Sequence, residues 1–309
     1  MKRFLALSLV IFLAACQPTP APEETQKLQV MTSFYPIEFF ATAIAGDRLD
    51  VVPLMPTGME PHDYEPSASQ FAKMEEADLI LVQGGLEPWL HDAEETLAQA
   101  GVPFVELNEL LVQLPAEEHE DEHEEEYEDE HDHGSLDPHT WLDPVLAMGM
   151  VEAIRDAFLE LDPEGEALYT QNAEELLSSL QGLDAEFKSG LSQCSKSDFV
   201  TAHNAFQYLA KRYNLKAHGI SGFSPHDEAS AQALSTLKEE VEALGLTHIY
   251  FEAGASTDVA QVLADEAGVS PLVLSTVEFL TEDQLAQGET YFSLMRQNLI
   301  QLRTGLQCQ

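Results

Sequence analysis

Hydrophobic and polar positions along the chain follow two patterns: short runs of apolar and β-branched residues, and longer stretches with an apolar residue every three or four positions. The first pattern predicts buried strands, and the second predicts helices with one apolar face. Strands are expected at Leu28–Ser33, Leu49–Leu54, Asp78–Val82, Pro103–Leu107, Phe199–Ala202, Leu215–Gly219, His248–Phe251 and Pro271–Leu274. Helices are expected at Glu38–Ala45, Ser67–Glu76, Leu86–Ala100, Ala229–Leu244, Ser256–Glu266 and Glu289–Leu302. This alternation indicates an α/β fold with parallel sheets.

Between the two groups of strands, Val145 to about Gly190 keeps helical spacing with one interruption, at Asp162-Pro163-Glu164-Gly165. A helical segment of this length is suited to connecting two lobes. We therefore interpret the chain as an N-terminal lobe at 28–144, a linking helical segment at 145–190 and a C-terminal lobe at 191–309. Each lobe is expected to hold a roughly four-stranded parallel sheet flanked by helices, and a long rigid helix joins the two.

The start of the chain has the pattern of an export signal. Two basic residues precede the twelve-residue apolar run Phe4–Ala15, which is shorter than the roughly 20 apolar residues that a membrane-spanning helix needs. Leu13-Ala14-Ala15-Cys16 resembles the bacterial lipoprotein cleavage box. We therefore expect removal of residues 1–15, a lipid on Cys16 that anchors the protein outside a membrane, and a flexible tether at 16–27.

The net charge of −41 disfavours nucleic acid and anionic lipid as partners, because both would repel such a surface. Part of this charge is concentrated at 117–133, where twelve acids and four histidines stand together. The segment permits two interpretations: a solvated charge block, or a flexible array that binds divalent metal weakly. In the second interpretation the binding groups include His119, His123, His131 and His133.

Two cysteines, Cys194 and Cys308, remain once the lipidation candidate is set aside. In an oxidising exported compartment, two leftover cysteines favour a disulfide over two unpaired thiols. Such a bond would hold the carboxyl-terminal helix against the start of the second lobe.

Three histidines stand in short and distinctive settings. They are His62 in Gly58-Met59-Glu60-Pro61-His62-Asp63-Tyr64, His139 in Asp137-Pro138-His139-Thr140-Trp141-Leu142-Asp143, and His203 in Thr201-Ala202-His203-Asn204. Each follows a predicted strand, and ligands of open α/β sheets bind outside the carboxyl ends of strands. Three convergent imidazoles suit zinc and leave one tetrahedral position open. The histidines therefore predict a metal site in a crevice between the lobes.

Together these features resemble the ZnuA-type, zinc-binding solute-binding lipoproteins of bacterial ABC importers. The resemblance extends from Val30-Met31-Thr32-Ser33-Phe34-Tyr35-Pro36 to the segment Tyr291–Leu299, with the three histidine motifs in the family's order. It implies that His62, His139 and His203 are ligands, and that Glu278 or water takes the fourth position. It also implies a monomer that captures Zn(II) as transported cargo in an interlobe cleft and delivers it to a membrane permease, with no catalytic residues.

Three other functions are weighed against this one. Manganese-binding relatives usually carry a glutamate where this chain has His203, and hard Mn(II) prefers carboxylate oxygen. A metal-dependent adhesin would use the same scaffold for surface display. A zinc hydrolase could use three histidines and water, but no assigned general base accompanies the three histidine motifs. The His-Glu-x-x-His match at His119–His123 lies in the acidic run and not in a predicted helix.

Side chains beside the histidines could orient the imidazole rings. Asp63, Asp143 and Asn204 are candidates, although such residues also serve as caps and turn formers. Some family members have an acid immediately before the first histidine; here that position is a proline, which leaves the role of Glu60 open. Trp141 is expected to pack and so position its loop. The remaining histidines outside the acidic run, His91, His218, His226 and His248, are interpreted as structural or surface residues.

Overall fold

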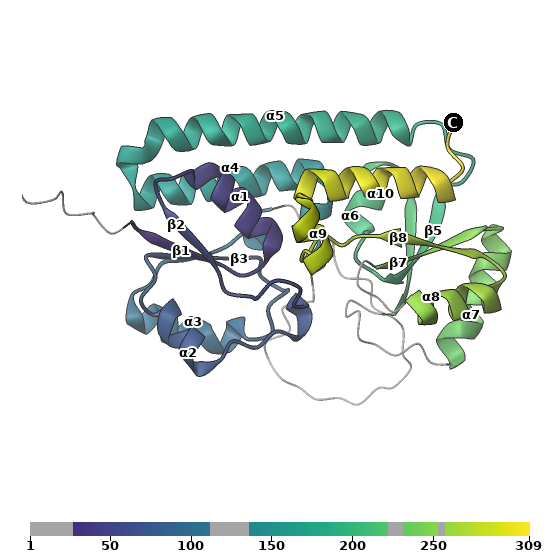
Figure 1. Cartoon of the computed structure of the whole chain (residues 1–309), viewed down its shortest axis with the longest axis horizontal. Helices are drawn as coiled ribbons and strands as arrows, with labels where there is room; N and C mark the ends of the chain where they lie inside the picture. Colours follow the sequence, from purple (N-terminus) through teal and green to yellow (C-terminus); the bar gives the residue numbers. More distant parts are fainter. Residues whose placement is uncertain (1–26, 112–135, 222–230, 253–256) are drawn as a thin grey trace, which may run out of the picture.

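The computed structural model describes residues 27–111, 136–221, 231–252 and 257–309, and the side chain of His203 lies outside that description. Two lobes lie side by side, and the longest helix, α5 (Glu166–Gly190), runs along both of them (Figure 1). This arrangement confirms the predicted fold class. The expected signal peptide, the lipidated Cys16 and the acidic run 117–133 all lie outside the described residues.

The first lobe is built on a four-stranded parallel sheet of order β2-β1-β3-β4. Its strands are β1 (Gln29–Thr32), β2 (Asp50–Pro53), β3 (Leu79–Val82) and β4 (Phe104–Glu106). Every residue of the central strand β3 is buried, as expected for a parallel strand covered on both faces. Helix α1 (Tyr35–Ala45) lies on one face, and α2 (Ala68–Met74) and α3 (Leu90–Ala100) lie on the other (Figure 1).

The second lobe repeats this order as β6-β5-β7-β8. Its strands are β5 (Asp198–His203), β6 (Lys216–Ser221), β7 (His248–Glu252) and β8 (Ser270–Leu274). Its helices are α6 (Gln207–Arg212), α7 (Ala231–Leu244), α8 (Thr257–Ala267), α9 (Glu282–Gln287) and α10 (Tyr291–Gly305). In both sheets the order of the strands switches side next to the first strand of the lobe, between β1 and β3 and between β5 and β7. Such a switch point opens a crevice at the carboxyl ends of the strands.

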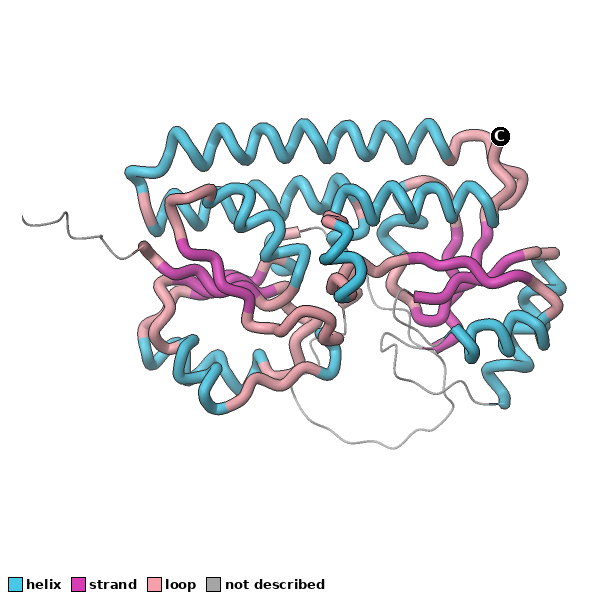
Figure 2. Tube along the Cα trace, viewed as in Figure 1, coloured by secondary structure: helices cyan, strands magenta, loops and turns pink. Residues whose placement is uncertain are grey.

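The predicted linking segment forms two antiparallel helices, α4 (Pro144–Leu161) and α5, rather than one continuous rod (Figure 2). A proline at 163 cannot continue α4, and a short 3-10 turn reverses the chain there. Asp162 holds the turn: it accepts hydrogen bonds from Arg48 and, at 2.6 Å, from the hydroxyl of Tyr169. Asn172 of α5 donates to the carbonyl of Ile44 at 3.0 Å, so the hairpin is tied to α1.

Helix α10 begins near the middle of the molecule, runs along the second lobe toward the C-terminus and packs against β8 and α5 (Figure 1). Thr290 begins the helix by accepting from the backbone N–H of Ser293 at 3.3 Å. At the other end, a disulfide joins Cys194 to Cys308, which confirms the predicted bond.

The expected strands and long helices are present, with boundaries shifted by a few residues. Helix α1 begins at Tyr35, three residues before the expected start, because Pro36 suits the first turn of a helix. The six-residue helices α6 and α9 were not predicted; they are too short to show a helical period. No helix in the described ranges has the length and apolarity to cross a bilayer.

Candidate metal site

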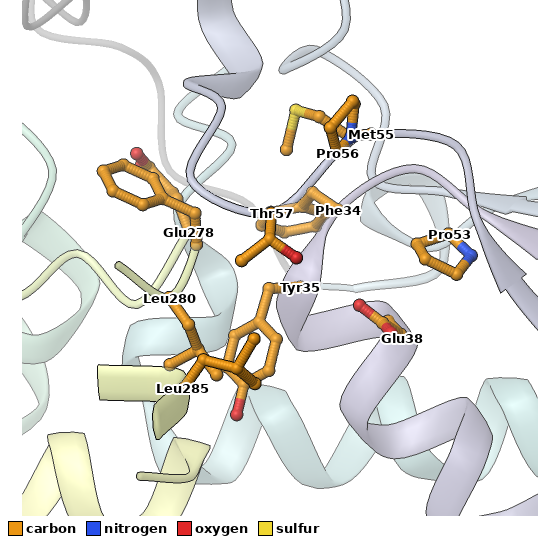
Figure 3. A pocket seen from close by; sticks show the side chains of 11 residues that line it. Phe34, Tyr35, Glu38, Pro53, Met55, Pro56, Thr57, Glu278, Leu280 and Leu285 are labelled. Atoms are coloured by element: carbon orange, nitrogen blue, oxygen red, sulfur yellow. The ribbon is translucent and has the colours of Figure 1, made fainter. Parts of the chain in front are cut away.

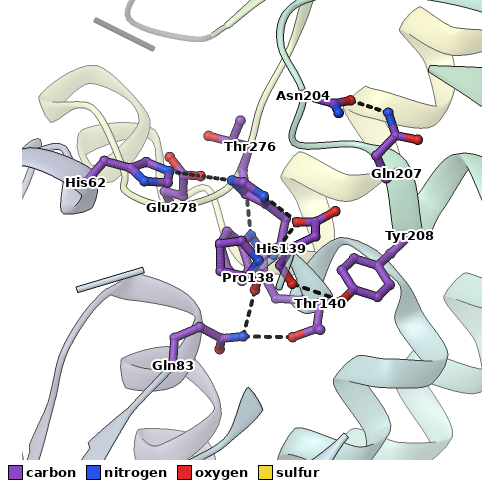
Figure 4. Close-up of polar contacts among 12 residues, drawn as sticks. His62, Gln83, Pro138, His139, Thr140, Asn204, Gln207, Tyr208, Thr276 and Glu278 are labelled. Carbon is purple, nitrogen blue, oxygen red and sulfur yellow. Dashed lines mark hydrogen bonds and ion pairs between the residues drawn. The ribbon is translucent and has the colours of Figure 1, made fainter. Parts of the chain in front are cut away.

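Three potential metal ligands converge between the lobes. His62 lies in the 3-10 turn Pro61–Asp63 beyond β2, His139 directly precedes the turn Thr140–Leu142, and Glu278 follows β8. One ligand atom of each lies within 4.8 Å of the others. Figure 4 shows the three side chains directed toward one another. The fold thus brings together two of the predicted histidines and the predicted carboxylate.

The spacing of these atoms suits a small, closely coordinated ion. Oε1 of Glu278 lies 3.5 Å from Nε2 of His139 and 3.8 Å from Nε2 of His62. Donor atoms around a tetrahedral zinc ion stand roughly 3.3–3.6 Å apart, given bond lengths of about 2.0–2.2 Å. Glu278 and His139 are fully buried, and the side chain of His62 is 11% exposed. Within the described residues, Glu278 forms ion pairs with these two histidines alone.

Asp137 fixes the orientation of the His139 ring. Its Oδ1 accepts from the backbone N–H of His139 at 3.0 Å and faces ring Nδ1 at 2.7 Å. A carboxylate at that position requires Nδ1 to carry a proton, which leaves Nε2 as the ligand atom. Asp137 was not predicted to do this, although an acid two residues before a ligand can reach both groups. Of the predicted orienting residues, Asp143 instead caps α4, accepting from the N–H of Val145 at 2.8 Å.

Buried charges in the site stabilise one another. Burial alone would lower the pKa of His139, but the hydrogen bond and charge of Asp137, followed by those of Glu278, raise it to about 10. Burial alone would raise the pKa of Glu278, but hydrogen bonds and charges of His139 and His62 bring it well below its usual range. The histidine and the carboxylate thus each favour the charged form of the other. A metal ion and a proton would compete for Nε2 of His139.

Glu60 lies at the edge of the same cluster. Its carboxylate accepts from the backbone N–H of His62 at 3.4 Å and caps the turn that carries this histidine. Burial, followed by the negative charge of Glu278, raises the pKa of Glu60 to about 8. The proline between Glu60 and His62 therefore does not remove this acid from the site.

Both lobes hold the loop that carries His139 (Figure 4). From the first lobe, the amide of Gln83 donates to the carbonyl of Pro138 at 2.7 Å and to the hydroxyl of Thr140 at 2.8 Å. From the second lobe, the hydroxyl of Tyr208 on α6 donates to the carbonyl of Asp137 at 2.9 Å. The ligand loop is thus fixed at its base from two sides, which preorganises the site.

The remaining predicted residues have mixed outcomes. The backbone of His203 ends β5 at the carboxyl edge of the sheet, but its side chain is outside the described part of the structure, as are His226, His119, His123, His131 and His133. Asn204 accepts a hydrogen bond from Gln207. His218 pairs with Asp198 at 3.1 Å and His248 contacts the hydroxyl of Thr247 at 2.9 Å, in keeping with structural roles.

A cavity of about 90 Å³ adjoins the site between the loop after β2 and the segment after β8 (Figure 3). Its lining is mostly apolar, with Thr57 in the middle and Glu38 on the side away from Glu278. Such a lining offers few donors to a metal ion. Within the described part of the chain, the group of side chains placed to hold a cation is that of His62, His139 and Glu278.

The chain matches the family model described as zinc-uptake complex component A, periplasmic (ZnuA), over residues 30–305. It is 39% identical over 306 residues to the zinc-binding lipoprotein AdcA of Streptococcus pneumoniae serotype 4, covering 97% of this chain and 59% of AdcA. It is 37% identical over 308 residues to the high-affinity zinc uptake system protein ZnuA of Bacillus subtilis strain 168, covering 98% of this chain and 96% of that protein.

Among solved structures, the chain is similar to the Zn(II)-bound ZnuA-like domain of Streptococcus pneumoniae AdcA. The two superpose with a TM-score of 0.79 at 38% identity, covering 91% of this chain and 99% of that domain. The similarity therefore includes both lobes and the crevice between them.

Proposed function

This chain belongs to the ZnuA family of periplasmic zinc-uptake components, and on that premise we propose that it captures Zn(II) between its lobes and delivers it to the permease of an ABC importer. It binds and releases the ion and carries out no chemical reaction on it. Relatives named for zinc binding and zinc uptake support the choice of ion. The chain spans 59% of the length of AdcA but 96% of the Bacillus protein, so the proposal follows the shorter relative.

The convergence of His62, His139 and Glu278 within 4.8 Å carries this proposal. Two nitrogen donors and one carboxylate oxygen form a donor set that zinc accepts readily. We propose His203 as the remaining ligand, because it follows β5 at the carboxyl edge that faces the crevice. We further propose that the protein is exported, works as a monomer and is anchored through a lipid on Cys16. This anchor would keep the protein at the membrane, near the permease.

Metal competition on purified apo-protein tests this function. We expect zinc to bind more tightly than manganese. His139→Ala and His203→Ala should each weaken zinc binding by more than the roughly tenfold that loss of an outer hydrogen bond costs. His218→Ala is the matched control, because this histidine also pairs with an aspartate but lies away from the site. Tighter binding of manganese, or equal losses in all three variants, would contradict the proposal.

A further inference from the structure

Two buried polar side chains of α10 contact the two segments that carry Glu278 and His139. Tyr291 and Asn298 are seven residues apart, so they lie two turns apart on one face of the helix, separated by roughly 10 Å along its axis. Tyr291 is fully buried and Asn298 is 1% exposed. Neither side chain belongs to the cluster of ligand atoms, yet each is hydrogen-bonded to a segment that carries a ligand.

Tyr291 holds the loop of His139. Its hydroxyl donates to the carbonyl of Trp141 at 2.6 Å. Trp141 stands two residues after His139, is fully buried, and packs edge-on against Phe34 with ring centroids 4.7 Å apart. The tyrosine therefore fixes the backbone that directly follows the ligand.

Asn298 holds the segment of Glu278 through both atoms of its amide. Oδ1 accepts from the N–H of Ser275 at 2.8 Å, and Nδ2 donates to the carbonyl of the same residue at 2.7 Å. The segment needs such support, since Val277 adopts φ of +59°. This conformation is costly for a β-branched residue and persists only where the surroundings impose it.

Trp141 closes the connection between the two segments. Its indole N–H donates to the carbonyl of Thr276 at 2.7 Å. A continuous set of bonds thus runs from α10 to the His139 loop, across to the Glu278 segment, and back to α10. This circuit joins the two segments whose ligand atoms, Nε2 of His139 and Oε1 of Glu278, lie 3.5 Å apart.

We propose that Tyr291 and Asn298 are positioning residues that determine which ion the site selects, an inference that rests on the proposed zinc function. Holding His139 and Glu278 at a fixed short separation favours a small tetrahedral ion with bonds of about 2.0–2.2 Å. Mn(II) prefers more oxygen ligands and a larger, octahedral arrangement. Loosening the circuit lets the carboxylate move away from the imidazole, which costs zinc more than it costs manganese.

The test compares Tyr291→Phe with Tyr169→Phe in the full chain. Both tyrosines are fully buried, and each donates one hydrogen bond of 2.6 Å, but Tyr169 donates to Asp162 at the turn between α4 and α5. Zinc and manganese affinities are measured by competition, the geometry of the site by the absorption spectrum of bound Co(II), and stability by thermal unfolding of the apo-protein. Asn298→Asp, which retains the acceptor for Ser275 but not the donor, is the second variant.

We expect Tyr291→Phe to weaken zinc binding about tenfold, to lower the ratio of zinc to manganese affinity, and to change the Co(II) spectrum. Tyr169→Phe should lower thermal stability and leave the ratio and the spectrum as in the wild type. Wild-type ratio and spectrum in Tyr291→Phe would overturn the inference while leaving zinc binding by the wild type intact. Equal changes in both tyrosine variants would also overturn it, as a general effect of stability. A wild-type protein that binds no zinc would overturn the proposed function and this inference together.

Discussion

Replacing Asp137 with asparagine should weaken the contact that orients the His139 ring while leaving the ring itself in place. Oδ1 of Asp137 faces two donors, the ring Nδ1 at 2.7 Å and the backbone N–H at 3.0 Å. Hydrogen bonds to charged groups contribute about 1.5–3 kcal/mol to stability. Asparagine has nearly the same size and keeps a carbonyl acceptor, so only the part due to the negative charge is lost. We therefore expect zinc affinity to fall by about 1.4 kcal/mol, or about tenfold.

Asp143→Asn is the control for this measurement. Asp143 lies on the same loop and is also buried, but it caps α4 and lies 3.6 Å from Arg212 rather than contacting His139. Titration of each apo-protein against a chelator of known affinity gives the two zinc dissociation constants. A change below twofold in Asp137→Asn, or an equal loss in the control, would refute the argument that the carboxylate orients the ligand.

Three further predictions concern the scaffold and the acidic run. Replacing Cys194 and Cys308 with serine should destabilise the protein by about 4–5 kcal/mol on the chain-entropy model, since the residues are 114 positions apart, and chemical denaturation of wild type and variant checks this. A hydrogen bond from Arg48 lowers the pKa of Asp162 to about 2, so the stability that this ion pair contributes is complete above about pH 4 and is lost as the pH falls toward 2. The difference in unfolding free energy between wild type and Arg48→Gln should therefore shrink over that window, and a constant difference would contradict the prediction. Deleting 117–133 should remove weak zinc sites in calorimetry and spare the tight one; loss of the tight site with folding intact would mean that the ligands lie elsewhere.

The periodicity of the sequence was sufficient to predict the architecture, because buried parallel strands and long amphipathic helices each have a regular pattern of apolar residues. It also located the break before α5, where a proline forbids continuation of α4, but it did not show that the chain reverses there. The direction of the second helix depends on Asp162, Arg48 and Tyr169, which meet only in the folded chain. The assigned boundaries of the two lobes remain a prediction.

The candidate site was predictable to the extent that its residues stand in recognisable local motifs. His62 and His139 could be identified in this way, and Glu278 followed from the family resemblance. The contacts that hold them could not be identified, because Trp141, Thr276 and Tyr291 are far apart in the sequence and have no short-range signature. The positive φ of Val277 has no such signal either, since the residue type argues against it. The side chain of His203 remains an untested ligand.

The bond between Cys194 and Cys308 has a topological consequence: it encloses the whole of the second sheet, together with α10, in a covalent ring. A protease that cuts the backbone once within this ring opens it without separating the pieces. Glu278 and His203 both lie inside the ring, so they stay on one molecule with His62 and His139 after such a cut. An extracytoplasmic compartment exposes the protein to proteases. A single cleavage within the ring would give two fragments on a reducing gel and a single species of full mass on a non-reducing gel.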